Sequence, residues 1–312
     1  MNINNKLIVI LGPTATGKTK VAARLAVKFN GEIISADSRQ VYQGMDIGTG
    51  KDLDDYVVKR KTHSAKRKTI SYHLIDVVGP KTEFNVAKYQ KLAYQAIDNV
   101  LSRGKVPFLV GGTGLYIDAV VNGYAFSVTH SAKRKTQNIR DRLNKLSLRQ
   151  LLARLKKVDL ETYQVIDHKN RRRVQRALEI YYISGKPKSA KSPNQLPPYE
   201  ILVLGIKYPL QEIYQKIDSR LGKRMKQGMI SEIKNLRRQR VSWQRLDDFG
   251  LEYRWVANYL RGKISYEQMI SGLKNAIHHF AKRQITWFKR NKDIIWIKNY
   301  ADARDRIKKF LK

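Results

Sequence analysis

The segment GPTATGKT, residues 12–19, has the residue types and spacing of a phosphate-binding loop. Gly12 and Gly17 permit tight turns in which backbone N–H groups approach an anion. Lys18 supplies a point charge to terminal phosphate oxygens, and the hydroxyl of Thr19 is placed to ligate Mg²⁺, the cofactor we predict. The predicted diphosphate-binding residues are Gly12, Pro13, Thr14, Ala15, Thr16, Gly17, Lys18 and Thr19.

The loop alone does not specify which phosphate or diphosphate it holds. An ATP-hydrolysing protein would normally also have an apolar strand that ends in an acid. Asp76, after HLI, is the near match in this sequence, and it is as easily a turn residue. The sequence therefore makes a weak case for ATP.

Two further segments contain candidate substrate contacts. Asp37 follows the apolar segment GEIISA, where it is positioned to accept a proton from an attacking nucleophile. Its alternative role is an N-cap for the turn DSRQ. Thr113 lies among the glycines of GGTGLY, which permit the close approach of a ligand or only the packing of a strand against a helix.

The elements that must position these residues alternate through the first 125 residues. This alternation predicts a doubly wound parallel sheet with ligands at the carboxyl ends of its strands. We therefore predict an α/β fold, a P-loop NTPase-like parallel sheet flanked by helices, whose first part spans residues 1–125. The predicted strands are 6–11, 31–37, 73–78 and 106–110, and the predicted helices are 18–29 and 85–103.

Helical patterning and basic residues dominate from residue 131 to residue 191. This stretch has 18 Lys and Arg against 5 Asp and Glu, an excess of 13. We predict an inserted basic all-helical domain over residues 126–198, which ends in a linker rich in Pro, Ser and Lys. The α/β core then returns over 199–312, with a strand at 199–206, helices near 210–240 and 265–290, a strand at 294–297 and a last helix. The stretch KRKTHSAKRKT, residues 59–69, is predicted to be a mobile surface loop.

The charge of the chain points to a polyanionic partner. There are 62 Lys and Arg against 26 Asp and Glu, a formal net charge of +36. Such a surface attracts nucleic acid or an anionic membrane, but the apolar runs are far too short to span a bilayer, and we expect no membrane partner. Zero cysteines exclude disulfides, thiolate zinc sites and cysteine nucleophiles. Since neither a secretory nor a transit pattern is visible, we expect a cytoplasmic protein, acting as a monomer.

Seven segments resemble, in the same order, those of the tRNA dimethylallyltransferases, the IPP transferase family. The resemblance spans roughly residues 6–297, and its second and last segments are much more specific than the phosphate loop. The segments are GPTATGKT, IISADSRQVYQGMDIGTGK (33–51), YHLIDV (72–77), GKVPFLVGGTGLYI (104–117), RRRVQRALEIYYISGKP (171–187), IYQKIDSRLGKRM (213–225) and AKRQITWFKR (281–290).

The resemblance implies the reaction and the catalytic residues. The loop would hold the diphosphate of dimethylallyl diphosphate, and the exocyclic N6 of the adenosine just 3′ of the tRNA anticodon, tRNA position 37, would be alkylated as pyrophosphate leaves. Asp37 would accept the amine proton. Lys18, Mg²⁺ on Thr19, and Arg220 of the IDSR segment would stabilise the charge that builds on the pyrophosphate.

The resemblance also implies the tRNA contacts. The adenosine must be extruded from the anticodon loop into a protein channel, and the RRVQR segment would grip the anticodon stem-loop. The side-chain amide of Gln40 suits adenine, which offers a donor and an acceptor together. The basic helix face could instead be merely solvated, and Trp287 and Phe288 suit a core better than base stacking. The predicted tRNA-binding residues are Asp37, Ser38, Arg39, Gln40, Thr113, Arg172, Arg173, Val174, Gln175 and Arg176.

Other functions remain open from the sequence. An adenylate isopentenyltransferase acts on a free nucleotide and would not need the basic helical insertion, whereas a P-loop kinase for a small metabolite predicts ATP turnover. A non-enzymatic RNA-binding module with a vestigial loop is a third possibility. The chain departs from the family pattern at Asp52, where a proline is usual, and at FGLEYRW, residues 249–255. We expect neither departure to touch the catalytic residues.

Overall fold

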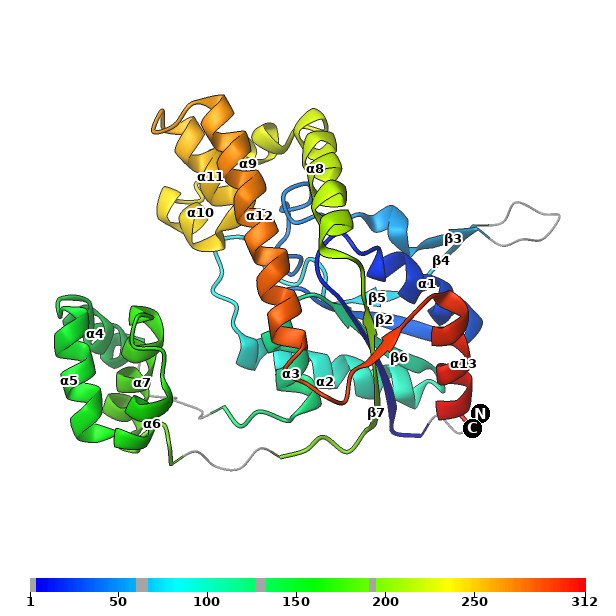
Figure 1. Ribbon diagram of the computed structural model, residues 1–312, viewed down its shortest axis with the longest axis horizontal. Coiled ribbons are helices and arrows are strands. Elements are labelled where there is room, and N and C mark those ends of the chain that lie inside the picture. Colours follow the sequence, from blue (N-terminus) through cyan, green and yellow to red (C-terminus); the bar gives the residue numbers. More distant parts are fainter. Residues whose placement is uncertain (1–3, 60–66, 127–132, 191–194) are drawn as a thin grey trace. The chain divides into compact units, whose positions relative to one another are not determined.

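The computed structural model describes residues 4–59, 67–126, 133–190 and 195–312 (Figure 1). The chain divides into two compact units. The first consists of Met1–Val121 and Pro197–Lys312, and the second of Asn122–Leu196. Each unit is described by itself below.

The first unit is built on a six-stranded sheet in which every paired strand runs parallel to its neighbour. The strand order is β5-β2-β6-β1-β7-β8, so β1 lies between β6 and β7, with Ile10 opposite both Val110 and Leu204. The strands are β1 Lys6–Leu11, β2 Gly31–Ala36, β5 Tyr72–His73, β6 Val106–Gly111, β7 Glu200–Ile206 and β8 Ile295–Ile297.

Helices cover both faces of this sheet because its central strands are apolar on both faces. On β1, Ile8 and Ile10 pack with helices α1 (Lys18–Lys28) and α13 (Tyr300–Phe310). The alternate residues Leu7 and Val9 face the other way and pack with α2 (Val86–Ser102) and α3 (Gly114–Val121). The phosphate loop joins β1 to α1, so the sheet fixes it at the carboxyl edge.

A layer of helices follows β7 and completes the first unit. Figure 1 shows α9, α10 and α11 gathered around one end of the long helix α12. Gly228 and Gly250, both with positive φ, separate α8 from α9 and α10 from α11. The bounds are α8 Leu210–Lys226, α9 Met229–Arg238, α10 Trp243–Phe249, α11 Leu251–Leu260 and α12 Tyr266–Phe288.

The second unit consists of helices in its described residues, with a small core of its own. A capping box at Ser147 begins the second of its helices, and Leu151, Leu155, Val174 and Leu178 meet in the core. The helices are α4 Lys133–Asn144, α5 Leu148–Val158, α6 Leu160–Val165 and α7 Arg171–Ser184. Within the part of the chain that the structure describes, no helix is both long and apolar enough to cross a membrane.

The structure corrects several sequence-based expectations. Of the strand predicted over 73–78, only His73 lies in a strand, at the end of β5, because Leu74 and Asp76 adopt left-handed backbone with φ of 64° and 56°. The helix predicted over 210–240 is the separate pair α8 and α9, and α10 and α11 were not predicted.

The basic stretch 59–69 also differs from the expected loop at both of its ends. They belong to an antiparallel pair of strands, β3 (Val57–Lys59) and β4 (Arg67–Thr69), which follow a 3₁₀ helix η1 (Leu53–Tyr56). The rest of the stretch predicted to be mobile, residues 60–66, lies outside the described residues.

Candidate diphosphate and acceptor site

The phosphate loop has a fixed shape in this structure. Ala15 and Gly17 have φ of 63° and 71°, and the buried hydroxyl of Thr16 donates to the carbonyl of Pro13 at 2.9 Å. The backbone N–H of Thr14 donates to Oε1 of Gln284 at 2.9 Å. The Thr14 N–H and the Thr16 hydroxyl therefore help to hold the loop in shape.

Lys18 is the cation of the loop. Its Nζ lies 3.4 Å from the carbonyl of Pro13. Burial lowers the pKa of Lys18 to about 8; the charge of Asp37 opposes this shift and that of Arg220 adds to it. Lys18, Asp37 and Arg220 therefore interact electrostatically, although they come from α1, the end of β2 and α8. An arriving diphosphate would restore the full charge of the lysine.

Gln284 is a site residue that the sequence argument missed. Besides accepting from Thr14, it donates through Nε2 to the carbonyl of Gly112 at 2.7 Å, and it is buried. A Cβ on Gly112 would lie 2.6 Å from that nitrogen and 3.4 Å from Lys18 Nζ. One buried amide thus joins the loops that follow β1 and β6. The available signal was its place on the buried stripe Leu273, Ile277, Ala281, Gln284 and Phe288.

Asp37 caps the DSRQ turn, one of the two roles that its position suggested. Its Oδ1 accepts from the backbone N–H groups of Arg39 at 2.9 Å and Gln40 at 3.3 Å, so this oxygen caps the DSRQ turn. Among the described residues, Oδ2 has no hydrogen-bond partner. The turn is also tied to the glycine loop, because Ser38 N–H donates to Oγ1 of Thr113 at 3.1 Å. A capped carboxylate with one open oxygen is well suited to accept a proton.

The predicted reader of adenine, Gln40, is engaged at both ends of its amide. Its Nε2 donates to the carbonyl of Gly50 at 3.2 Å, and its Oε1 accepts from the hydroxyl of Ser35 at 3.2 Å. Base recognition by this side chain would require both bonds to be exchanged. In this structure Gln40 braces the turn that carries Asp37.

Arg220 lies against the segment that follows the DSRQ turn. Its Nη2 donates to Oδ2 of Asp52 at 2.6 Å and to the carbonyl of Gly50 at 3.2 Å. The expectation that the departure at position 52 would not touch the predicted catalytic residues is therefore wrong. Arg220 is 30% exposed, so it can meet a ligand.

A family model described as IPP transferase matches residues 40–291, well over half of the chain. The chain belongs to the IPP transferase family. It is 43% identical over 308 residues to the tRNA dimethylallyltransferase 1 of Syntrophus aciditrophicus (strain SB), which covers 97% of each chain.

Solved structures agree with this assignment. The crystal structure of the tRNA isopentenylpyrophosphate transferase from Bacillus halodurans matches with a TM-score of 0.70 at 32% identity, over 98% of this chain and 97% of that one. A eukaryotic dimethylallyltransferase acting on tRNA matches with a TM-score of 0.77 at 25% identity, over 97% of this chain and 77% of that one. The predicted family and the predicted parallel α/β fold are confirmed.

In this IPP transferase the glycines of GGTGLY serve packing at two positions. A Cβ on Gly111 would lie 2.2 Å from the carbonyl oxygen of Ala36, and one on Gly114 would lie 2.4 Å from the ring of Trp287. Trp287 donates to Asp118 at 2.7 Å, and Phe288 is buried. The prediction that these aromatic residues belong to the core is confirmed for Phe288, whereas Trp287 is half-buried and packs against the core.

The second departure from the family pattern, residues 249–255, also reaches the site. Glu252 is buried, and its carboxylate accepts hydrogen bonds from Nη1 of Arg39 at 3.1 Å and from Nη1 of Arg224 at 3.4 Å. Arg39, predicted to contact tRNA, is thereby held by the protein. Burial and then the charge of Arg220 lower the pKa of Arg224, whose Nε is buried without a partner among the described residues.

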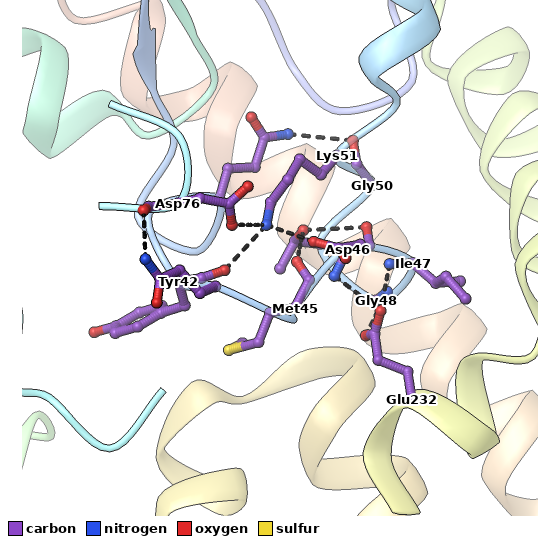
Figure 2. Close-up of polar contacts among 12 residues, drawn as sticks. Tyr42, Met45, Asp46, Ile47, Gly48, Gly50, Lys51, Asp76 and Glu232 are labelled. Atoms are coloured by element: carbon purple, nitrogen blue, oxygen red, sulfur yellow. Dashed lines mark hydrogen bonds and ion pairs between the residues drawn. The ribbon is translucent and has the colours of Figure 1, made fainter. Parts of the chain in front are cut away.

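Figure 2 shows how Lys51 is held near the DSRQ turn. Its buried Nζ contacts Asp46 at 2.6 Å, Asp76 at 2.5 Å and the carbonyl of Tyr42 at 3.0 Å. Asp76, the near match to an ATPase acid, is therefore a turn residue that neutralises a buried lysine.

The same figure shows an anion held by the backbone of this IPP transferase. Glu232 of α9 accepts from the N–H groups of Asp46, Ile47 and Gly48, at 2.8, 2.5 and 3.1 Å, and from the hydroxyl of Tyr253 at 2.8 Å. The segment between the turn and Gly50 is thus pinned to the helical layer.

The predicted tRNA-binding segment begins helix α7 of the second unit. Arg172, Arg173 and Arg176 are exposed, and Arg176 pairs with Glu179 at 2.8 Å. Val174 is fully buried in the core of this unit, so its side chain stabilises the helix. Nε2 of Gln175 donates to Asn144 of α4 at 2.9 Å. The arginines are therefore the members of this segment that are exposed to a polyanion.

Proposed function

We propose that this IPP transferase moves a dimethylallyl group from dimethylallyl diphosphate to N6 of the adenosine just 3′ of the anticodon, tRNA position 37. The products are N6-(dimethylallyl)adenosine and pyrophosphate. The observation that carries the proposal is that the charges of Asp37 and Arg220 both act on Lys18 of the phosphate loop, while one oxygen of the Asp37 carboxylate caps its own turn and the other stays open in the described part of the chain. A base and two cations at one edge of a sheet suit a transfer that releases a proton and an anion.

The phosphate loop supports diphosphate binding through backbone N–H groups at the start of α1 and through Lys18. Lys18 meets the diphosphate as a point charge, whereas the planar guanidinium of Arg220 can bind two of its oxygens. These contacts strengthen as the bond from carbon to oxygen breaks, because charge then collects on the departing pyrophosphate.

The residues present fit a Mg²⁺ ion. Thr19 is half-buried at the start of α1, and its hydroxyl has no hydrogen-bond partner in the described part of the chain. Mg²⁺ prefers oxygen ligands and is commonly held by few protein groups together with substrate phosphates, so Thr19 and a diphosphate form a suitable donor set. When bound, the ion would neutralise charge on the diphosphate.

Asp37 supports the second half of the reaction. As the bond from N6 to the allylic carbon forms and the bond from that carbon to the diphosphate breaks, the amine must lose a proton. The open oxygen Oδ2 can accept it, while Oδ1 stays in the turn and fixes the orientation of the carboxylate.

The second unit supports tRNA as the acceptor. Its 18 Lys and Arg against 5 Asp and Glu give an excess of 13 positive charges, which attracts a phosphate backbone. A free nucleotide would have no use for that surface. A P-loop kinase is also disfavoured, because Asp76 is committed to Lys51 and is not placed at a strand end.

A direct assay tests this function. Purified protein is mixed with labelled dimethylallyl diphosphate, Mg²⁺ and a tRNA with adenosine at position 37, and the modified nucleoside is identified by mass spectrometry. The controls are the same tRNA with guanosine at that position, AMP as acceptor, and ATP as donor. Label in AMP but not in tRNA, or phosphoryl transfer from ATP alone, would contradict the proposal.

A further inference from the structure

We propose that Asp52 is a positioning residue, which holds Arg220 at the diphosphate site so that the arginine meets the charge developing on the leaving pyrophosphate. The proposal rests on the proposed function, in which Arg220 has that role. The contact that carries it is the ion pair between Nη2 of Arg220 and Oδ2 of Asp52, at 2.6 Å.

Asp52 forgoes a local hydrogen bond to make this ion pair. It occupies the N-cap position of η1, where an aspartate side chain ordinarily accepts from an N–H group of the first turn. Here the side chain makes no such bond, and the turn is closed by the backbone carbonyl of Asp52, which accepts from Asp55 N–H at 3.0 Å. The carboxylate is directed instead to a guanidinium 168 positions away in the chain.

A second acceptor holds the same nitrogen of Arg220. The carbonyl of Gly50 accepts from Nη2 at 3.2 Å, and it also accepts from Nε2 of Gln40 at 3.2 Å. Gly50 has φ of 65°, and a Cβ there would lie 2.4 Å from Nη2 of Arg220. The arginine therefore rests directly on the backbone that follows the turn carrying Asp37.

This arrangement uses one nitrogen of the guanidinium and leaves the others. Nε and Nη1 of Arg220 have no hydrogen-bond partner within the described ranges, and the side chain is 30% exposed. A planar guanidinium that is held through one nitrogen presents its remaining N–H donors in a fixed direction. Asp52 thus orients the arginine without consuming the donors that a diphosphate would take.

Electrostatics gives a reason for a carboxylate at this position. Besides burial, the charge of Arg220 lowers the pKa of both Lys18 and Arg224, and Glu252 pairs with Arg224 at 3.4 Å. Asp52 does the same for Arg220. With a neutral residue at position 52, repulsion from the two neighbouring cations would favour rotamers that carry Arg220 toward solvent.

The central test is Asp52→Asn, which keeps the size of the side chain and removes its charge. We expect kcat for prenyl transfer to fall about tenfold, less than the roughly hundredfold that misplacing a catalytic group by an ångström can cost. The KM for dimethylallyl diphosphate should stay within about twofold, because the lost interaction belongs to the transition state. Asp52→Glu should recover part of the rate.

A double-mutant cycle shows whether Asp52 acts through Arg220. In an Arg220→Ala background, Asp52→Asn should cause no further loss. Asp54→Asn is the matched control: it is a neighbouring aspartate of η1, is exposed and has no side-chain partner among the described residues, so kcat and KM should stay unchanged. Melting curves of all variants separate loss of fold from loss of rate.

Several results would overturn the proposal. If Asp52→Asn lowers KM and keeps or raises kcat, Asp52 competes with the diphosphate for Arg220. If it slows the Arg220→Ala enzyme as strongly as the wild type, it acts by another route. If the wild type transfers the prenyl group and Asp52→Asn is equally active, the positioning role is contradicted and the proposed function stands. If the wild type itself is inactive, the proposed function is contradicted.

A binding experiment tests the positioning role whatever the acceptor is. Pyrophosphate carries the charge of the leaving group, so it should bind Asp52→Asn more weakly than the wild type when titrated without tRNA. Equal or tighter binding would contradict the role of Asp52 even if the protein transferred no prenyl group.

Discussion

Gln284, on the buried face of α12 near its C-terminal end, accepts a hydrogen bond from the backbone N–H of Thr14 at 2.9 Å, across 270 positions of sequence. Its other end donates to Gly112 at 2.7 Å. The long helix α12 therefore sets the distance between two loops of the sheet. The geometry of the first loop, whose backbone N–H groups belong to the proposed diphosphate site, therefore depends on a residue of the last third of the chain.

Gln284→Leu should damage both stability and diphosphate binding. The change leaves the N–H of Thr14 and the carbonyl of Gly112 without their partner, so we expect a loss of about 1–3 kcal/mol in the free energy of unfolding. Urea denaturation measures this loss, and a pyrophosphate titration should show weaker binding. Asn275→Ala, at an exposed position of the same helix, is the control and should change neither quantity. Unaltered pyrophosphate affinity in Gln284→Leu would show that the loop keeps its shape unaided.

The lowered pKa of Lys18 predicts proton uptake when a diphosphate binds. The pKa is about 8 in the unliganded protein, because burial and Arg220 outweigh Asp37. A bound diphosphate favours the charged lysine, so about half a proton should be taken up at pH 8. Calorimetric titrations of pyrophosphate in buffers with different ionisation enthalpies measure it.

The lowered pKa of Lys18 also sets the direction in which diphosphate affinity changes with pH. Above pH 8 the unliganded lysine becomes neutral, and affinity for the diphosphate should fall by up to tenfold for each further pH unit. Lys18→Met should bind weakly at every pH and lose this dependence. A wild-type affinity that stays level from pH 7 to pH 10 would show that Lys18 does not hold the diphosphate.

Asp37→Asn separates the two roles of that carboxylate. The amide keeps an acceptor oxygen for the N–H groups of Arg39 and Gln40, so the DSRQ turn should survive. The amide is not a base, and single-turnover transfer should slow by about 10²- to 10⁴-fold. Filter binding should give nearly wild-type affinity for tRNA. A rate close to that of the wild type would mean that the proton leaves by another path.

Much of this site followed from the sequence because its residues are contiguous. The phosphate loop and the DSRQ turn each lie directly after a buried strand, and parallel strands bring such segments to one edge. The strand predicted over 73–78 was wrong because Leu74 and Asp76 take left-handed backbone, which an apolar pattern does not reveal.

What the sequence could not supply are the partners that come from other elements. Asp52 was visible as a departure from the family pattern, but its pairing with Arg220 depends on where α8 passes. Gln284 was visible on an apolar stripe. Its hydrogen-bond partners, the N–H of Thr14 and the carbonyl of Gly112, lie on loops far earlier in the chain. Long-range pairing of this kind is decided by tertiary packing and leaves no periodic signal.

The exposed arginines of α7 should govern tRNA affinity and leave the chemical step intact. Arg172→Ala and Arg173→Ala should each weaken binding and reduce the salt dependence by roughly one unit for each lost phosphate contact. With saturating tRNA the single-turnover rate should match the wild type. The contrasting variant is Val174→Ala in the same turn: its side chain is fully buried, so it should destabilise the second unit through a cavity. If Arg172→Ala kept both the affinity and the salt dependence of the wild type, that arginine would belong to a solvated helix face.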